Sequence, residues 1–216
     1  MKKNSIKSAR TASRIDEPTM IYANVAGVEL QFETAPSLFS PTKLDRGSLA
    51  MLSCISFETN DKVLDLACGY GLIGIYAAKV IGPGRVWMAD NDPTAVEYTV
   101  KNLAVNGVEG VNVVVSDGFR EIREANFTKI VCNPPYHADF SVPKHFIEKG
   151  FNRLVMDGAM YLVTKRKTWY QNKLRSIFGR ARVHELDTYL VFEAVKRSFT
   201  YAGRRPLNDH TKTAKT

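Results

Sequence analysis

Asn133, Pro134, Pro135 and Tyr136 follow directly on an apolar run that ends in Ile-Val-Cys. Proline has no backbone donor and fixes its own φ, so a sheet strand cannot simply continue through two of them. The prolines would hold two acceptors still, the side-chain carbonyl of Asn133 and the backbone carbonyl of Pro134. Tyr136 offers a flat face on which a planar group can stack. The pattern predicts a clamp for a planar amino group, with these four residues as the catalytic set.

A glycine loop, Gly69-x-Gly71-x-x-Gly74, lies upstream of this clamp. It follows an apolar strand, and Asp90 ends the next strand, which is the arrangement of a dinucleotide fingerprint. Asp65 stands four residues before Gly69, however, and would repel the pyrophosphate of a dinucleotide by roughly 1 kcal/mol or more. The same carboxylate attracts the ammonium and sulfonium groups of S-adenosylmethionine. Charge therefore favours the methyl donor over NAD(P).

Three acidic strand ends then acquire roles in holding that cofactor. We expect Asp65 near the methionine ammonium, Asp90 at the ribose hydroxyls and Asp117 at the adenine amino group. The predicted cofactor-binding residues are Asp65, Ala67, Gly69, Gly71, Asp90, Asn91, Asp117, Gly118 and Asn133. His137 is interpreted as a wall of the target pocket rather than as a base, because an amine becomes acidic only after it has accepted a methyl group.

Alternating strands and helices must position these residues. The sequence predicts a hairpin over 20–33, then a proline-punctuated loop and a helix near 47–56. The predicted strands of the main sheet are 62–68, 85–90, 111–117, 128–133, 159–165, 180–186 and 188–196. The predicted helices between them are 71–80, 93–106, 143–156 and 168–179.

Near-continuous apolar strands between helices indicate a parallel sheet that is covered on both faces. The last two strands are too close in sequence for a crossover helix, so one of them runs antiparallel. We therefore predict an α/β fold, a doubly wound, mostly parallel seven-stranded sheet with an antiparallel terminal strand. Its ligands lie at the carboxyl ends of the strands. The predicted division is a basic, flexible arm over 1–19, one domain over 20–197 and a basic, flexible tail over 198–216.

Composition excludes some classes of protein. The chain has 216 residues, 44% of them hydrophobic, which suffices for one substantial core. It contains no apolar run of the roughly 18 residues that a membrane helix needs, and its basic start does not resemble a secretory signal. A cytoplasmic protein without membrane contact is the expectation. The three cysteines have neither metal-ligand spacing nor a disulfide pattern, so no metal is predicted.

The formal net charge of +8 fits either solvated tails or a polyanionic partner. Lys165, Arg166 and Lys167 fall at the carboxyl end of a predicted strand, on the same edge as the clamp. Trp169 and Tyr170 follow at once. Cations interleaved with aromatic residues suit a phosphate backbone and an unstacked base, although the two aromatics could equally belong to the core. RNA is the predicted partner.

Taken together, the segments "VLDLACGYGLIGI", "MADNDPTAVEYTVKNLAVNG", "VVSDGF" and "IVCNPPYH" resemble the class I methyltransferases. The closest resemblance is to the catalytic domain of the small-subunit ribosomal RNA guanine-N2 methyltransferases, over about residues 20–197. "SLFSPTKLDRGS" and "KRKTWYQNKLRSIFG" add to it. The resemblance implies that Gly69, Gly71, Asp90 and Asp117 hold S-adenosylmethionine and that the residues from Asn133 to Tyr136 hold the target.

Other functions remain open at this point. The clamp also suits a glutamine side-chain amide of a protein or adenine N6 of DNA, although enzymes of those kinds usually carry a further recognition domain. An RNA-binding module that keeps the fold without turnover is a third possibility, and an NAD(P) oxidoreductase is a distant fourth. The sequence does not indicate the oligomeric state, the modified nucleotide or a choice between ribosomal and transfer RNA.

Overall fold

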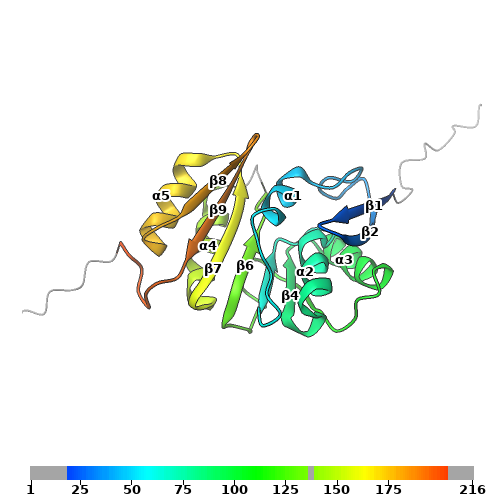
Figure 1. Ribbon diagram of the computed structural model, residues 1–216, viewed down its shortest axis with the longest axis horizontal. Coiled ribbons are helices and arrows are strands. Elements are labelled where there is room, and N and C mark those ends of the chain that lie inside the picture. Colours follow the sequence, from blue (N-terminus) through cyan, green and yellow to red (C-terminus); the bar gives the residue numbers. More distant parts are fainter. Residues whose placement is uncertain (1–18, 136–138, 204–216) are drawn as a thin grey trace, which may run out of the picture.

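A seven-stranded sheet with the strand order β5-β4-β3-β6-β7-β9-β8 runs through the middle of the molecule. Figure 1 labels β4, β6, β7, β8 and β9 of this sheet. The computed structural model describes residues 19–135 and 139–203. The strands are β3 (Val63–Leu66), β4 (Val86–Asp90), β5 (Asn112–Val115), β6 (Phe127–Cys132), β7 (Leu154–Thr164), β8 (Arg182–Leu186) and β9 (Tyr189–Val195). Strands β3 to β7 pair in parallel, whereas β9 is antiparallel to both β7 and β8. The predicted fold class is confirmed.

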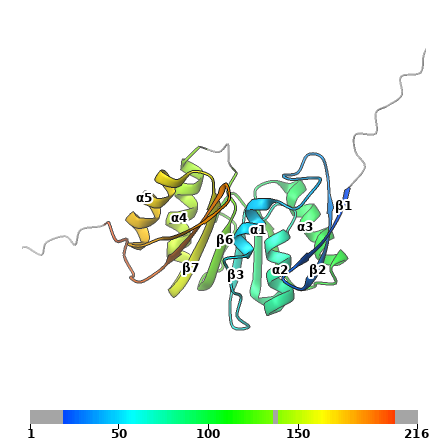
Figure 2. The same cartoon turned by 45° about the horizontal axis from the view of Figure 1, so that its top comes forward.

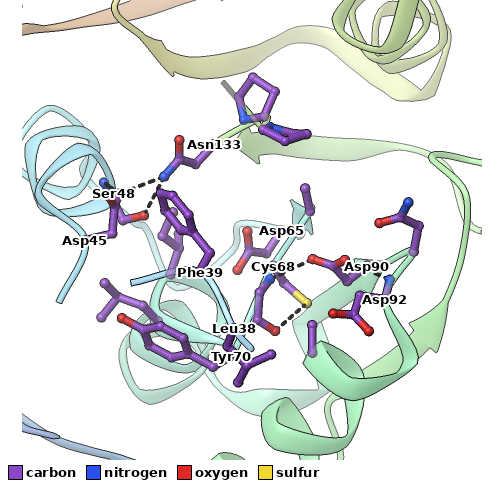
Figure 3. A pocket seen from close by; sticks show the side chains of 18 residues that line it. Leu38, Phe39, Asp45, Ser48, Asp65, Cys68, Tyr70, Asp90, Asp92 and Asn133 are labelled. Atoms are coloured by element: carbon purple, nitrogen blue, oxygen red, sulfur yellow. Dashed lines mark hydrogen bonds between the residues drawn. The ribbon is translucent and has the colours of Figure 1, made fainter. Parts of the chain in front are cut away.

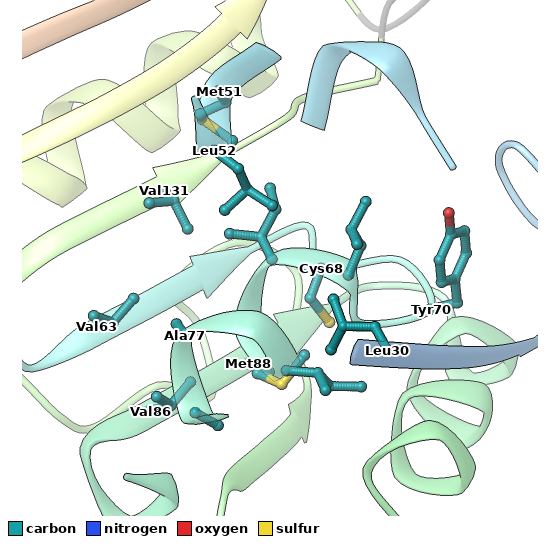
Figure 4. Close-up of a cluster of buried hydrophobic side chains, with 14 of the residues drawn as sticks. Leu30, Met51, Leu52, Val63, Cys68, Tyr70, Ala77, Val86, Met88 and Val131 are labelled. Atoms are coloured by element: carbon teal, nitrogen blue, oxygen red, sulfur yellow. The ribbon is translucent and has the colours of Figure 1, made fainter. Parts of the chain in front are cut away.

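Helices cover both faces of this sheet. One face packs against α1 (Arg46–Leu52), α2 (Leu72–Ile81) and α3 (Pro93–Val105), and the other against α4 (Ser141–Arg153) and α5 (Lys167–Phe178). Successive strand residues point to opposite faces, so Val131 joins the first cluster and its neighbours Ile130 and Cys132 join the second. Figure 4 shows part of the first cluster. Burial on both faces explains why the strands read as continuous apolar runs.

The N-terminal hairpin, β1 (Thr19–Val25) and β2 (Val28–Thr34), is attached to α3 by two asparagines. Asn102 and Asn106 lie one helical turn apart, so both side chains face β2. Asn102 Oδ1 accepts from the Glu33 N–H at 2.6 Å and its Nδ2 donates to the Glu33 carbonyl at 3.0 Å. Asn106 repeats both bonds with Gln31. The two amides thus complete the edge of β2, and the hairpin lies beside α3, far from α5 (Figure 2).

Two predicted helix ends are wrong. The helix expected over 143–156 ends at Arg153, because Leu154 already pairs with Phe127 as the first residue of β7. The start of β7 is irregular, with φ 63° at Asp157 and a register shift opposite Phe127. Because of this irregularity, the sequence there lacks the regular alternation that predicts a strand. The helix expected near 47–56 ends earlier too, at Leu52.

The chain also stays in contact with the domain beyond residue 197, where the flexible tail was expected to begin. Tyr201 donates from its hydroxyl to the Glu148 carbonyl at 3.1 Å, and its ring contacts Phe151 edge-on. The N–H groups of Ala202 and Gly203 donate to carbonyls at the end of α5. Residues 201–203 of the predicted tail therefore contact the domain, the flexibility of both tails stays a prediction, and residues 1–18 and 204–216 lie outside the described part. Within the described residues, no helix is long and apolar enough to span a bilayer.

Candidate active site

A cavity of about 200 Å³ opens at the carboxyl ends of β3, β4 and β6. Its lining includes eight of the residues predicted from the sequence: Asp65, Ala67, Gly69, Asp90, Asn91, Asn133, Pro134 and Pro135. Figure 3 shows Asn133 with Asp45 and Ser48 on one side of this cavity and Asp90 and Asp92 on the other, with Asp65 between them. The structure thus brings the three described residues of the clamp and most of the predicted cofactor residues into one site.

The glycine loop wraps closely around the end of β3. Gly71 is the residue before α2 and has φ 102°, and a Cβ there would lie 2.9 Å from Ile75 Cδ1. Gly74 lies in the first turn of α2, where a Cβ would come within 2.6 Å of Met88 Cε. Both glycines therefore let α2 approach β4, and Gly71 is not part of the cavity lining. Ala67 has φ 61°, a backbone conformation that is costly for a residue with a side chain and is concentrated at functional sites.

Asp90 ties this loop to the next one. Its Oδ2 accepts from the Gly69 N–H at 2.8 Å, and its Oδ1 accepts from the Asp92 N–H at 3.0 Å. Each carboxylate oxygen has further acceptor capacity, and Asp90 is only half-buried at the cavity wall. Asp92 in turn caps α3 by accepting from the Thr94 N–H at 2.8 Å. The carboxylate of Asp90 is thereby fixed in orientation and still able to bind a ligand hydroxyl.

The carboxyl group of Asp65 is almost completely buried, since only 1% of the residue is exposed. Its Oδ2 accepts from the Gly74 N–H at 2.8 Å, which caps the first turn of α2 in place of the side chain that Gly71 lacks. Burial raises the pKa of Asp65 to about 7, the Gly74 hydrogen bond opposes this, and the charge of Asp90 adds to it. A cationic ligand beside this carboxyl group would offset the effect of burial and favour its ionised form.

Asn133 is held by two residues that sequence reasoning missed. Its Nδ2 donates to Asp45 Oδ2 at 2.7 Å and to Ser48 Oγ at 3.0 Å. Its Oδ1 is buried and has no hydrogen-bond partner among the described residues. Asp45 is the N-cap of α1 and accepts from the backbone N–H of Ser48 in the first turn, and an aspartate directly before a helical run is a recognisable capping signal. That signal marks the helix start but does not reveal the contact with Asn133.

Two predicted cofactor residues lie elsewhere. Asp117 forms an exposed ion pair with Arg120 at 3.5 Å and lines a different cavity, together with His145 and Lys149 of α4. Gly118 lies directly under the His145 ring, which would collide with a Cβ at 2.9 Å. A contact of Asp117 and Gly118 with the cofactor therefore stays a prediction. Tyr136 and His137 lie outside the described residues.

The predicted basic tract lies on the same edge as the clamp, because β7 pairs with β6 through Leu162 and Cys132. Lys165, Arg166 and Lys167 follow the last residue of β7 and are exposed. Lys167 Nζ forms an ion pair with Glu185 at 2.5 Å, and Lys165 Nζ lies 4.9 Å from the centre of the Tyr189 ring.

Arg166 belongs to a stack of side chains that the sequence did not reveal. Its guanidinium carbon lies 5.1 Å from the centre of the Phe140 ring, and Phe140 stacks on Trp169 at 4.5 Å with 20° between the planes. Phe140 is 37% exposed, so part of this stack faces solvent. Tyr170 instead packs in the core beside Phe192, as the alternative interpretation of these aromatics had it.

A mostly parallel seven-stranded sheet of this order, with a glycine loop after β3 and an acid at the end of β4, defines the fold of the S-adenosylmethionine-dependent methyltransferases. The sequence matches the methyltransferase small domain family over residues 29–193, and the chain belongs to that family.

The chain is similar to several ribosomal RNA methyltransferases. The ribosomal RNA small subunit methyltransferase C of Cronobacter sakazakii is 34% identical over 172 residues, which cover 77% of this chain and 50% of the relative. The ribosomal RNA large subunit methyltransferase G of Alteromonas mediterranea is 30% identical over 184 residues, covering 79% of this chain and 45% of the relative. The chain therefore spans about half the length of the curated relatives it matches. The resemblance predicted from the sequence is confirmed.

A solved structure is similar over most of the chain. A 16S rRNA N2 methyltransferase from T. thermophilus, in complex with AdoMet and guanosine, is 27% identical and superposes with a TM-score of 0.77. The match covers 88% of this chain and 53% of that one.

Proposed function

We propose that this chain is the catalytic domain of an S-adenosylmethionine-dependent methyltransferase that modifies an exocyclic amino group of RNA, guanine N2 of ribosomal RNA in the first instance. The observation that carries the proposal is the buried Oδ1 of Asn133, which has no hydrogen-bond partner among residues 19–135 and 139–203 and belongs to a residue that lines a cavity with several carboxylates. A buried acceptor without a donor is costly, so this oxygen, on a residue that lines the cavity, supports a ligand that supplies the donor.

The residues of the cavity fit S-adenosylmethionine. Bound there, the cofactor supplies a methyl group made electrophilic by its sulfonium. Asp65 balances the positive charge of the ligand, and a cation beside it stabilises the ionised carboxylate. Asp90, whose two oxygens are oriented by Gly69 and Asp92, accepts from ribose hydroxyls. A pyrophosphate would meet both of these carboxylates, which argues against a dinucleotide.

The clamp prepares the amino group for attack. Oδ1 of Asn133 and the carbonyl of Pro134 accept its two N–H bonds, which turns the nitrogen lone pair toward the methyl group. Such positioning matters because in-line transfer loses rate steeply when the reacting atoms are misplaced. The site needs no strong base, since the amine becomes acidic only once it carries the methyl. The target ring is expected to stack on Tyr136.

RNA is favoured over a protein substrate by the stack of Arg166, Phe140 and Trp169 on the same edge. A guanidinium on aromatic rings, flanked by Lys165 and Lys167, suits a phosphate backbone with unstacked bases. The named relatives, which act on RNA of the small or the large ribosomal subunit, support ribosomal RNA. A glutamine amide would also fit the clamp, but it would leave this stack without a role.

Transfer of a tritiated methyl group tests the proposal. The protein is incubated with labelled S-adenosylmethionine and, in separate reactions, an unmodified transcript of small-subunit ribosomal RNA, a transfer RNA transcript or a protein extract. We expect label in the ribosomal transcript, recovered as N2-methylguanosine after digestion to nucleosides. Label recovered as methylglutamine would overturn the RNA substrate. Cofactor binding without transfer to any of the three would indicate a non-catalytic RNA-binding module.

A further inference from the structure

The start of α1 fixes which way the Asn133 side chain faces. Asp45 Oδ2 already accepts from the Ser48 backbone N–H, so this oxygen acts as an acceptor, and the group 2.7 Å from it must be the amide nitrogen of Asn133 and not its oxygen. Ser48 Oγ, 3.0 Å from the same nitrogen, occupies the second amide hydrogen. Both hydrogens of Asn133 are therefore used inside the protein, and its oxygen is the only part left for a ligand.

The contact is buried and therefore strong. Asp45 is 6% exposed and Ser48 is 7% exposed. In such surroundings a hydrogen bond is stronger than in water, and an amide turned the other way would place its oxygen against the acceptor oxygen of Asp45. The orientation of Asn133 is thus set before any substrate arrives.

We propose that Asp45 and Ser48 are positioning residues that determine the specificity of the clamp for an N–H donor. They bind both amide hydrogens of Asn133, a residue that lines the cavity, and leave its oxygen as the acceptor, so the site accepts an amino group and rejects a carbonyl oxygen of similar size at the same place. This inference rests on the proposed function, because it assigns a target to the same clamp. Asp45 is 88 positions from Asn133 in the sequence, and nothing in the Asn-Pro-Pro-Tyr motif predicts it.

A second contact of Asp45 makes a sharp test possible. The same Oδ2 accepts from the Ser48 backbone N–H at 2.6 Å and so caps α1. In Asp45→Asn the new side chain turns its amide oxygen toward the Ser48 backbone N–H, because only the oxygen can accept from that group. The same oxygen can still accept from the Asn133 amide. In Ser48→Ala the cap is untouched, because it uses only the backbone of residue 48. Ser53→Ala is the matched control, since its hydroxyl bonds to the Ala50 carbonyl at the other end of the same helix.

Nuclear magnetic resonance of the ligand-free, ¹⁵N-labelled protein reads the side-chain amide directly. The Asn133 signal is assigned by its loss in Asn133→Asp. We expect both of its amide hydrogens to exchange slowly with water in the unsubstituted protein and in Ser53→Ala. In Ser48→Ala one of them should exchange about five-fold faster, as the loss of one hydrogen bond implies. Equal exchange in all three proteins would overturn the proposal.

Kinetics on the unmodified small-subunit RNA transcript supply the second readout. We expect kcat to fall about five-fold in Ser48→Ala and about a hundred-fold in Asp45→Ala, while the KM for S-adenosylmethionine stays unchanged. Asp45→Asn should recover most of the kcat. Equal losses in Asp45→Asn and Asp45→Ala, or an unchanged kcat in Ser48→Ala, would contradict a positioning role. Absence of transfer by the unsubstituted protein would refute the proposed function, and the amide exchange would still decide the orientation of Asn133.

Discussion

Replacing Asp65 with asparagine should make the ligand-free protein more stable at neutral and alkaline pH. Asparagine keeps an oxygen that can accept from the Gly74 N–H and has almost the same size, so the cap of α2 survives. What disappears is an ionisable group in a place that is 1% exposed. The prediction follows because burial raises the pKa of Asp65 from the ordinary value of 3.8 to about 7.

The direction of this pH dependence follows from the number of protons that the folded and the unfolded states bind. Between pH 3.8 and about 7 the carboxyl group is ionised in the unfolded chain and protonated in the folded protein. The folded state therefore binds more protons, and the contribution of Asp65 to the free energy of unfolding falls as the pH rises, until it levels off above about 7. Each pH unit in that window costs about 1.4 kcal/mol, so the full loss is at most about 4 kcal/mol.

Urea unfolding of the unsubstituted protein and of Asp65→Asn at about pH 5 and about pH 8 measures this. We expect the stability advantage of the variant to grow by up to about 3 kcal/mol between the two conditions, because about two pH units of the window lie between them. Asp92→Asn, a change at an exposed carboxylate of the same cavity, controls for the loss of one negative charge. If the difference in free energy of unfolding between Asp65→Asn and the unsubstituted protein were the same at both pH values, the idea that the buried Asp65 carboxyl group destabilises the ligand-free protein when it ionises would be refuted.

The remaining predictions concern the clamp, the RNA surface and the glycine loop. Asn133→Ala should abolish methyl transfer to RNA while calorimetry finds S-adenosylmethionine binding within a few-fold of normal; an equal loss of binding would mean that Asn133 is no substrate clamp. Replacing Lys165, Arg166 and Lys167 with alanine should weaken RNA binding. It should also reduce the slope of the logarithm of the binding constant against the logarithm of salt concentration by about 2, because each phosphate contact on a single strand contributes about 0.7. An unchanged slope would move the RNA path elsewhere. Gly74→Ala should destabilise the protein by about 1–3 kcal/mol in urea unfolding, because the added Cβ would come within 2.6 Å of Met88 Cε; unaltered stability would show that Met88 moves aside freely.

The sheet could be predicted from the sequence because its strands are apolar on both faces and separated by clear helix signals. Pro93, for example, opens α3 at the first helical position, where proline is well tolerated. The start of β7 escaped prediction because its first half is irregular and follows a helix without a break. Such a boundary depends on pairing with Phe127, which no local pattern expresses.

The candidate site was predictable where residues share one loop or strand end. Asp65, Gly69 and Asp90 lie at strand ends, and the parallel sheet gathers strand ends at one edge. The contact of Asp45 and Ser48 with Asn133 was not predictable, because it joins segments more than eighty positions apart through side chains. Nor does the sequence reveal that Asp65 caps α2, since that depends on how closely the helix approaches β3.

The binding of S-adenosylmethionine tests the central claim most directly, namely that this cavity uses the carboxylates of Asp65 and Asp90 to hold a cationic methyl donor. Calorimetric titrations of the unsubstituted protein and of Asp65→Asn with S-adenosylmethionine and with NAD would decide it. We predict that S-adenosylmethionine binds the unsubstituted protein, that Asp65→Asn weakens this binding at least about ten-fold, and that NAD gives no heat of binding. Tight binding of NAD together with no binding of S-adenosylmethionine would contradict the account.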